Sequence, residues 1–238
     1  MGSVVFPLLW LFPASSGDCQ ADRVQRIIHY AFRFFLGLIS ALGGMRFVFY
    51  NHGALDQTKG CLLVANHPTL LDVVLLISRL PQADCIIKKE LMFNPFLKAV
   101  VRWAGYIPND GGTSVVQEAI DKVRRGRKVI IFPEGTRSTR RGLNSFTAGF
   151  AHIAVRAHCL IVPLFIHCFP SALTKEDGWF TVPRQRPVLG ITVGTVVDPA
   201  VLYKTSDPVP VAVRKTTAAV EKYFQEKVDY ETRNSFGI

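Results

Sequence analysis

The chain has 238 residues, 49% of them hydrophobic, and is long enough to bury the core of one α/β domain. Its formal net charge of +10 at pH 7 favours contact with phosphate groups, on nucleic acid, on an anionic bilayer or on a phosphorylated metabolite. The five cysteines are odd in number and mostly lie in apolar runs, which indicates reduced, buried thiols in a cytosolic redox environment. Neither C-x-x-C nor H-E-x-x-H spacing occurs, so no metal site is expected.

Residues 1–54 predict an N-terminal amphipathic segment that associates with a membrane. The apolar run at residues 4–12 contains Pro7 and is too short to cross about 30 Å of hydrocarbon, so it does not predict a spanning helix. A signal peptide is the alternative, but no Lys or Arg precedes the run, whereas such peptides begin with positive charge.

Residues 22–50 predict a helix at the headgroup boundary of a bilayer. Large apolar side chains are interrupted there by four basic ones, which are Arg23, Arg26, His29 and Arg33. Aromatic rings on one side would bury while the arginines meet lipid phosphates. An ordinary amphipathic helix packed on the domain is the alternative. Gly43 and Gly44 are expected to end this helix, and the protein is expected at the cytosolic face of a membrane, attached peripherally or monotopically.

Residues 55–238 predict a single α/β domain with a mixed sheet flanked by helices, because short β-rich runs alternate with helical patterns. Ser114 and Gln117 have the spacing of a capping box at the start of one helix that ends near Gly126. Other helices are expected after Pro68, from residue 94, at 149–157 and at 209–228. Strands are expected at residues 61–65, 85–87, 129–132, 160–167 and 188–197.

The segment 66–72 (NHPTLLD) directly follows a predicted buried strand and leads into a predicted helix. Strand ends are where α/β folds expose reactive groups. Pro68 favours the first turn of a helix, which would bring Asp72 close to the ring Nδ1 of His67. A carboxylate there fixes the tautomer and leaves Nε2 free to accept a proton, so a substrate hydroxyl can take the place of the serine in a triad. The alternative is a helix-capping histidine beside an unrelated aspartate.

The segment 132–138 (FPEGTRS) also lies just beyond a predicted strand. Arg137 offers a fork of donors to a phosphate, Thr136 offers a hydroxyl, and Gly135 lets the backbone approach closely. Glu134 is expected either to orient Arg137 or to hydrogen-bond a substrate hydroxyl. A polar turn without a chemical role is the alternative interpretation.

Together the two segments resemble the lysophosphatidic-acid acyltransferase family of glycerolipid acyltransferases. The family pattern of His, four residues and Asp is present as His67 and Asp72, preceded by the usual Asn66, and the FPEGTRS block is complete. Two weaker segments agree, at residues 86–91 (IIKKEL) and 161–164 (IVPL), and the resemblance extends over residues 55–200.

The resemblance implies transfer of an acyl group from acyl-CoA or acyl carrier protein to a hydroxyl of a lysolipid such as lysophosphatidic acid. It implies no metal, no cofactor beyond the acyl thioester co-substrate and no covalent enzyme intermediate. His67 is implied as the general base and Asp72 as the residue that orients it. Substrate binding is implied for Asn66, Glu134, Gly135, Thr136 and Arg137. The expected partners are the lipid acceptor, the acyl carrier and an anionic membrane surface, and not nucleic acid.

Two departures from the family pattern concern the acceptor. The second block of the family usually ends in Ile-Asp-Arg, whereas residues 105–110 (GYIPND) end without an arginine. After the third block, Thr147 stands where the family commonly has Lys. Another lysolipid or a hydroxylated acyl product is therefore the alternative acceptor. Lys89, Arg140 and Arg141 are candidates to supply the missing positive charge.

Other functions lack the motifs that they require. A hydrolase would need a G-x-S-x-G elbow, a nucleotide-binding protein a Gly-rich phosphate loop, and a nucleic-acid module a reader motif. A non-catalytic anionic-lipid-binding protein is the alternative from a different class, because it would use the same basic surface. The basic cluster at residues 124–128 is expected to contact lipid or an acidic carrier, or only to complement the C-terminus of a helix.

Overall fold

A seven-stranded sheet lies at the centre of the computed structural model, which describes residues 17–51, 53, 55, 58–139, 142–177 and 183–235. The order across the sheet is β1-β7-β6-β2-β5-β3-β4, and all neighbours are parallel except β6 and β7. The strands are β1 (Arg46–Tyr50), β2 (Leu62–Ala65), β3 (Asp84–Lys88), β4 (Ile107–Asn109), β5 (Val129–Ile131), β6 (Ile161–Phe169) and β7 (Val188–Val193).

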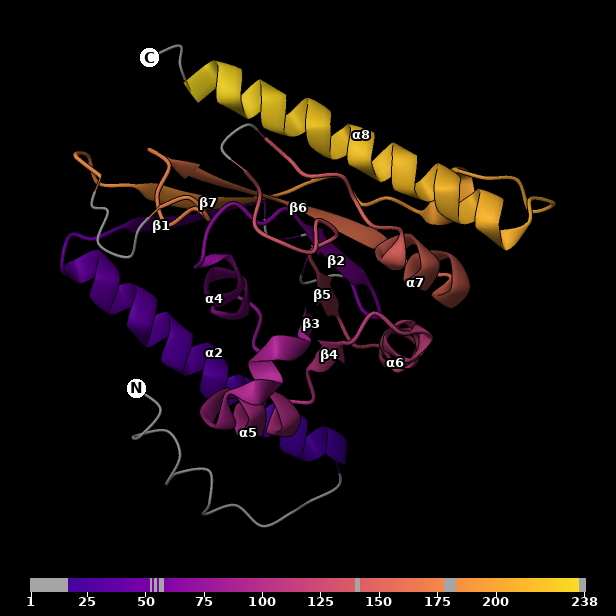
Figure 1. The fold of residues 1–238 in the computed structure, drawn as a ribbon, viewed down its shortest axis with the longest axis horizontal. Coiled ribbons are helices and arrows are strands. Elements are labelled where there is room, and N and C mark those ends of the chain that lie inside the picture. Colours follow the sequence, from indigo (N-terminus) through magenta and orange to yellow (C-terminus); the bar gives the residue numbers. More distant parts are fainter. Residues whose placement is uncertain are drawn as a thin grey trace.

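Helices cover both faces of this sheet, as Figure 1 shows, which confirms the expected mixed α/β architecture. All four residues of β2 are buried, with Leu63 and Ala65 facing one helical layer and Leu62 and Val64 facing the other. The first layer holds α2 (Gly17–Ala41), α4 (Asp72–Ile77) and α5 (Pro95–Trp103); the second holds α6 (Thr113–Arg124), α7 (Gly149–Ala157) and α8 (Val209–Ser235). Short 3-10 helices follow β3 and β7, namely η1 (Lys89–Phe93) and η2 (Pro199–Val201).

The carboxyl ends of β2, β5, β3 and β4 lie at the same edge of the sheet, because these four strands are parallel. Leu62 and Asp84 both pair with Val129, and Ile86 pairs with Ile107. Loops that leave parallel strands at such an edge form the ligand sites of open α/β sheets. The two sequence motifs follow β2 and β5, so the fold brings them to neighbouring positions.

Three elements differ from the sequence-based expectation. Residues 46–50, expected in the N-terminal segment that ends at residue 54, form β1 beside β7 within the domain's own sheet. The three-residue β4 was not predicted. The prediction of a capping box at Ser114 is wrong, because α6 starts at Thr113 with Gly112 as its N-cap and has no side-chain cap. Asp110 Oδ1 accepts a hydrogen bond from the backbone of Gly112 at 2.9 Å, which turns the chain into the helix before Ser114 is reached.

Helix α2 packs on the domain with one face and leaves another face exposed. Val24 and Ile28 are buried against the first layer. His29, expected among the cationic headgroup contacts, is also buried, with Nδ1 2.9 Å from the carbonyl oxygen of Ile77. The helix ends at Ala41, and Gly43 takes a φ of 78° just beyond it, as expected.

None of the described helices is both long enough and apolar enough to cross a membrane. The expectation for the apolar run at residues 4–12 lies outside the described residues.

A buried carboxylate ties α2 to the sheet. Asp84, at the start of β3, is fully buried and pairs with Arg127 and with Lys122, whose Nζ is 3.0 Å from Oδ1. Arg127 also pairs at 2.7 Å with Asp22 of α2, and Gln25 of α2 donates to Asp84 at 3.1 Å. Arg127 of the basic cluster therefore serves an internal network, which neither interpretation of that cluster anticipated.

The cysteines are free thiols, as expected for a reduced protein. Cys61, Cys85 and Cys159 are buried, but Cys19 is exposed on α2, so the expectation of a buried thiol is wrong there. Burial raises the pKa of Cys85 and Cys159 to about 12, which keeps both protonated at neutral pH.

Candidate active site

The loop after β2 is fastened to β6 before it reaches the histidine. Asn66 is buried, and its side chain donates to the carbonyl of Ile166 at 2.8 Å and accepts from the amide of Ile166 at 2.7 Å. This two-bond clamp fixes where the chain leaves the sheet. Asn66 thus lies beneath the site with its side chain occupied by backbone, so its contribution is to the position of the loop.

His67 and Asp72 form a hydrogen-bonded pair, with Nδ1 2.8 Å from Oδ2. The pair arises from a turn and not from a helix containing both residues, because α4 begins only at Asp72. Thr69 closes this turn by donating its backbone N–H to Oδ2 at 2.8 Å and its hydroxyl to Oδ1 at 2.5 Å. The carboxylate of Asp72 is thereby fully engaged and fully buried.

The environment of the pair sets its protonation chemistry. Burial raises the pKa of the Asp72 carboxyl above its ordinary value, although the hydrogen bonds from His67 and Thr69 act in the opposite direction. An ionised Asp72 requires the proton of a neutral ring to sit on Nδ1, so Nε2 presents a lone pair. Nε2 has no hydrogen-bond partner among the described residues. The His67 side chain is 21% exposed, and its ring packs on Phe132 with centroids 4.5 Å apart.

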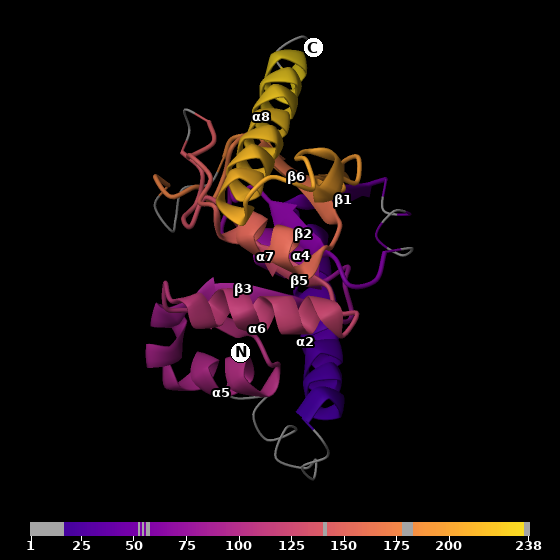
Figure 2. The ribbon, with the colours of Figure 1, turned by 90° about the vertical axis from the view of Figure 1, so that its right-hand side faces the viewer.

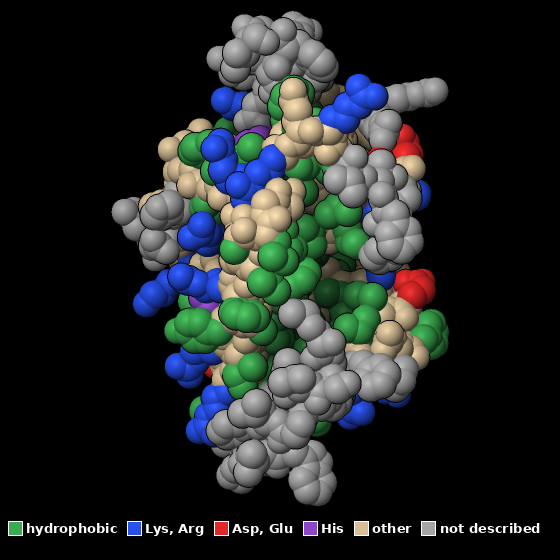
Figure 3. All heavy atoms as spheres, turned by 90° about the vertical axis from the view of Figure 1, so that its left-hand side faces the viewer, with side chains coloured by type: hydrophobic (Ala, Val, Ile, Leu, Met, Phe, Trp, Pro, Cys, Tyr) green, Lys and Arg blue, Asp and Glu red, His purple; other side chains and the backbone are tan. Residues whose placement is uncertain are grey.

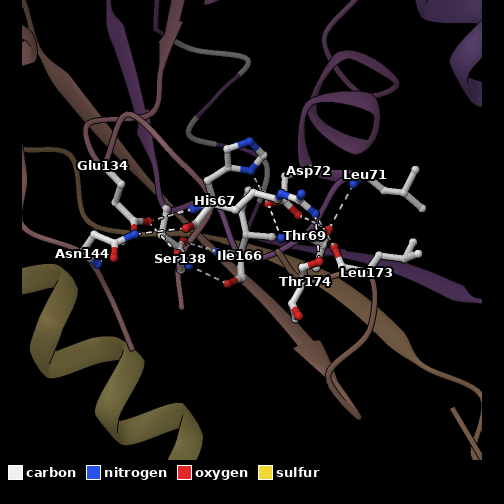
Figure 4. A network of polar contacts seen from close by, with 12 residues as sticks. His67, Thr69, Leu71, Asp72, Glu134, Ser138, Asn144, Ile166, Leu173 and Thr174 are labelled. Atoms are coloured by element: carbon white, nitrogen blue, oxygen red, sulfur yellow. Dashed lines mark hydrogen bonds and ion pairs between the residues drawn. The ribbon is translucent and has the colours of Figure 1, made fainter. Parts of the chain in front are cut away.

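Glu134 joins the two motifs, as the dashed contacts in Figure 4 show. Its Oε1 accepts from the backbone N–H of His67 at 3.0 Å and from the hydroxyl of Ser138 at 2.7 Å. Its Oε2 accepts from both the backbone and the side-chain nitrogen of Asn144 at 2.9 Å. Glu134 is 6% exposed, and in the described part of the chain its hydrogen bonds go to His67, Ser138 and Asn144 and not to the guanidinium of Arg137. Its geometry is that of a brace between loops.

Gly135, Thr136 and Arg137 continue the same loop toward solvent. Gly135 is exposed with a φ of 67°, a conformation that side chains other than glycine rarely adopt. Thr136 and Arg137 are half-buried. Nη1 of Arg137 donates to the backbone carbonyls of Leu173 and Thr174 at 3.2 and 2.9 Å, whereas Nε and Nη2 have no partner in the described ranges.

Several residues that build the site carried no signal of their own in the sequence. Thr69 and Ser138 lie inside the two motifs, so the sequence placed both residues near the site but did not indicate their contacts. Asn144 lies ten residues after Glu134, and the carbonyls of Leu173 and Thr174 come from the segment after β6; neither segment carries a motif. Arg140 and Arg141, candidates for added positive charge, lie outside the described residues.

Comparison with known families agrees with the motifs. The profile of the family described as Acyltransferase matches residues 46–167, just over half of the chain. Human 1-acyl-sn-glycerol-3-phosphate acyltransferase beta is 29% identical over 197 residues, which cover 77% of this chain and 69% of that protein. The 1-acyl-sn-glycerol-3-phosphate acyltransferases of Cocos nucifera and Limnanthes douglasii are 31% and 29% identical over 44% and 57% of this chain, covering 36% and 49% of their own length.

The fold has a counterpart among solved structures. The crystal structure of the 1-acyl-sn-glycerophosphate (LPA) acyltransferase PlsC from Thermotoga maritima superposes with a TM-score of 0.66 at 21% identity, covering 96% of this chain and 88% of that one. At this identity the likeness establishes the fold alone. The family profile and the named relatives establish more: this chain belongs to the lysophosphatidic-acid acyltransferase family of O-acyltransferases.

Proposed function

We propose that the chain transfers an acyl group from acyl-CoA or acyl carrier protein to a hydroxyl of a lysophospholipid such as lysophosphatidic acid. The observation that carries this proposal is the His67–Asp72 pair, with a buried, fully hydrogen-bonded carboxylate and a partly exposed ring. The names of the matched relatives support the reaction type and the acceptor class.

In the proposed reaction, Nε2 of His67 removes the proton from the acceptor hydroxyl as its oxygen attacks the thioester carbonyl carbon. The imidazolium that forms is stabilised by Asp72, to which it donates through Nδ1. Collapse of the tetrahedral intermediate breaks the carbon–sulfur bond, and the imidazolium returns its proton to the leaving thiolate. Positioning both substrates makes the attack effectively intramolecular, which supplies a large share of the rate.

The remaining site residues divide by what their side chains touch. Asn66 and Glu134 are proposed to position the His67 loop, because both are buried and fully hydrogen-bonded within the protein. Gly135, Thr136 and Arg137 are proposed to meet the acceptor near its phosphate, supported by their exposure and by the unpaired donors of Arg137 in the described part of the chain. The acyl thioester is the only co-substrate that the proposal requires.

A membrane surface is the proposed place of action. The exposed face of α2 carries Tyr30, Phe34 and Leu38, and Leu42 follows directly after the helix; these four are between 43% and 78% exposed, and exposed arginines lie among them. Figure 3 views the end of the molecule where α2 stops and shows hydrophobic side chains gathered in its central and lower part, with Lys and Arg along one margin. Such a surface suits contact with an anionic leaflet, proposed to be the cytosolic one.

A non-catalytic anionic-lipid-binding protein would use the same surface, so the decisive experiment separates chemistry from binding. Purified full-length protein carrying His67→Ala is assayed for thiol release from acyl-CoA with lysophosphatidic acid and for sedimentation with anionic vesicles. Transfer should fall by about 10³-fold or more, whereas vesicle binding should persist.

His152→Gln is the matched control, since this half-buried histidine lies on α7 outside the motif loops and should leave both measurements unchanged. Full transfer activity in the His67→Ala protein would refute the proposed mechanism.

A further inference from the structure

A cavity of about 470 Å³ lies where η1, α5, β4 and the first turn of α6 meet. Figure 2 shows α5, α6 and β3 in the lower half of the molecule, and the cavity lies in this region. Two lysines and two carboxylates line the cavity, along with apolar side chains that include the exposed Phe93 and the buried Val115; the charged residues are Lys89, Lys98, Asp110 and Glu118.

The sheet register places this cavity beside the catalytic pair. Leu62, Val129 and Asp84 share one row, and Ile86 pairs with Ile107. Because β2, β5, β3 and β4 are parallel neighbours, the chain leaves β3 before Lys89 and β4 before Asp110 at the same edge of the sheet as the loop that carries His67. With neighbouring strands about 4.8 Å apart, β3 lies about 10 Å from β2 across the sheet, and β4 lies one strand further.

The four charged side chains of the cavity are exposed to solvent. Among the described residues, none of the four forms an ion pair, and Asp110 makes only the hydrogen bond from Gly112 to its Oδ1. The cavity therefore offers cationic and anionic groups side by side. A ligand with a doubly charged phosphate monoester would place negative charge next to Asp110 and Glu118. A ligand that carries one charge of each sign would satisfy both sets.

From these observations we propose that the cavity binds the zwitterionic headgroup of a lysophospholipid, a phosphodiester that ends in a cationic amine. The phosphorus of such a lipid is four bonds from its free hydroxyl oxygen and the amine nitrogen is four bonds further, or roughly 5 and 10 Å when extended. With the hydroxyl at His67, the phosphate reaches toward Lys89 and Lys98, which take the place proposed above for Arg137, and the amine reaches Asp110 and Glu118. The proposal rests on the proposed function, for which it names the acceptor class.

The test compares acceptors that share one acyl chain and differ only in the headgroup, using the full-length protein and acyl-CoA. The headgroups are ethanolamine, glycerol and the bare phosphate. For the wild type, kcat/KM for the ethanolamine acceptor should exceed that for the other two by about tenfold. The double substitution Asp110→Asn with Glu118→Gln should lower the ratio of ethanolamine to glycerol acceptor about tenfold. Glu226→Gln, an exposed site on α8, should leave that ratio unchanged.

A binding experiment makes failure of this inference distinguishable from failure of the proposed function. Calorimetry with glycerophosphoethanolamine on the His67→Ala protein should show binding that the Asp110→Asn, Glu118→Gln pair weakens about tenfold. Charge-dependent binding without acyl transfer to any acceptor would retain the headgroup site and reject the proposed function. His67-dependent transfer that favours the bare phosphate, or a ratio that the double substitution does not change, would overturn the headgroup site.

Discussion

At the scale of single residues, the chemistry depends on which nitrogen of His67 carries the proton. Asp72→Asn keeps the shape of the side chain but can present an amide N–H to Nδ1, which moves the ring proton to Nε2. The base is then lost, and we expect kcat to fall by about 10³- to 10⁴-fold. Thiol release from acyl-CoA measures the effect. A variant that retained more than a tenth of the wild-type kcat would contradict the assigned role of the pair.

Asp72→Asn should also change how the free energy of unfolding depends on pH. Since burial raises the pKa of Asp72 in the folded state, the folded protein binds more protons than the unfolded chain above the unfolded pKa of about 4. The contribution of Asp72 is therefore greatest at low pH and is lost as the pH rises through the folded pKa. Asp72→Asn lacks this titration, so its free energy of unfolding relative to the wild type should increase from pH 4 to pH 7. Urea denaturation at both pH values tests the sign.

Glu134 illustrates how one buried carboxylate can position a base that it does not activate. Its two oxygens accept four hydrogen bonds, and the amide nitrogen of Glu134→Gln cannot accept any. At least one buried donor loses its partner, at a cost of about 1–3 kcal/mol in the free energy of unfolding. We expect kcat to fall as well, because the backbone N–H of His67 is one of those donors. Chemical denaturation and turnover of Glu134→Gln, with Glu226→Gln as the control, test both effects.

At the scale of elements, the attachment of α2 depends on Asp84. Arg127→Met removes one cation from this buried carboxylate and the ion pair to Asp22, while Lys122 remains. Leaving a buried charge short of a partner is costly, and we expect a loss of about 3 kcal/mol in the free energy of unfolding. Hydrogen exchange should rise first in α2. Arg214→Met, at an exposed arginine of α8, is the control, and an equal loss in both variants would argue against a specific role of the network.

The elements also show what a single sequence can reveal. The His67–Asp72 contact spans five residues, so local spacing sufficed to predict the pair, although a turn and not the expected helix creates it. The braces of the site connect residues 67 and 100 positions apart, at Glu134 with His67 and at Asn66 with Ile166, and these contacts depend on strand order. β1 was missed because its residues continue the apolar and aromatic character of the long amphipathic helix that precedes them.

At the scale of the whole molecule, the two helical layers present different surfaces. The catalytic loops occupy one edge of the sheet, whereas the exposed apolar face of α2 belongs to the first layer. Because α2 is fastened to the sheet through Asp84, a membrane that binds this face also holds the sheet in a defined orientation. The membrane contact proposed for α2 would therefore also fix how the catalytic edge of the sheet is oriented relative to the bilayer.

Vesicle binding tests this arrangement. Phe34 of α2 and Leu42, which directly follows the helix, are 69% and 78% exposed, so replacing both with serine should leave the folded protein intact while removing apolar surface from the interface. Each lost side chain should weaken partitioning by about tenfold or more. Val201→Ser is the matched control, because Val201 is 78% exposed but belongs to η2, which contacts α7 in the opposite layer. Sedimentation with anionic vesicles measures partitioning, and high salt should weaken it further by screening the arginines. If the double variant bound vesicles as well as the wild type, α2 would not be the membrane contact.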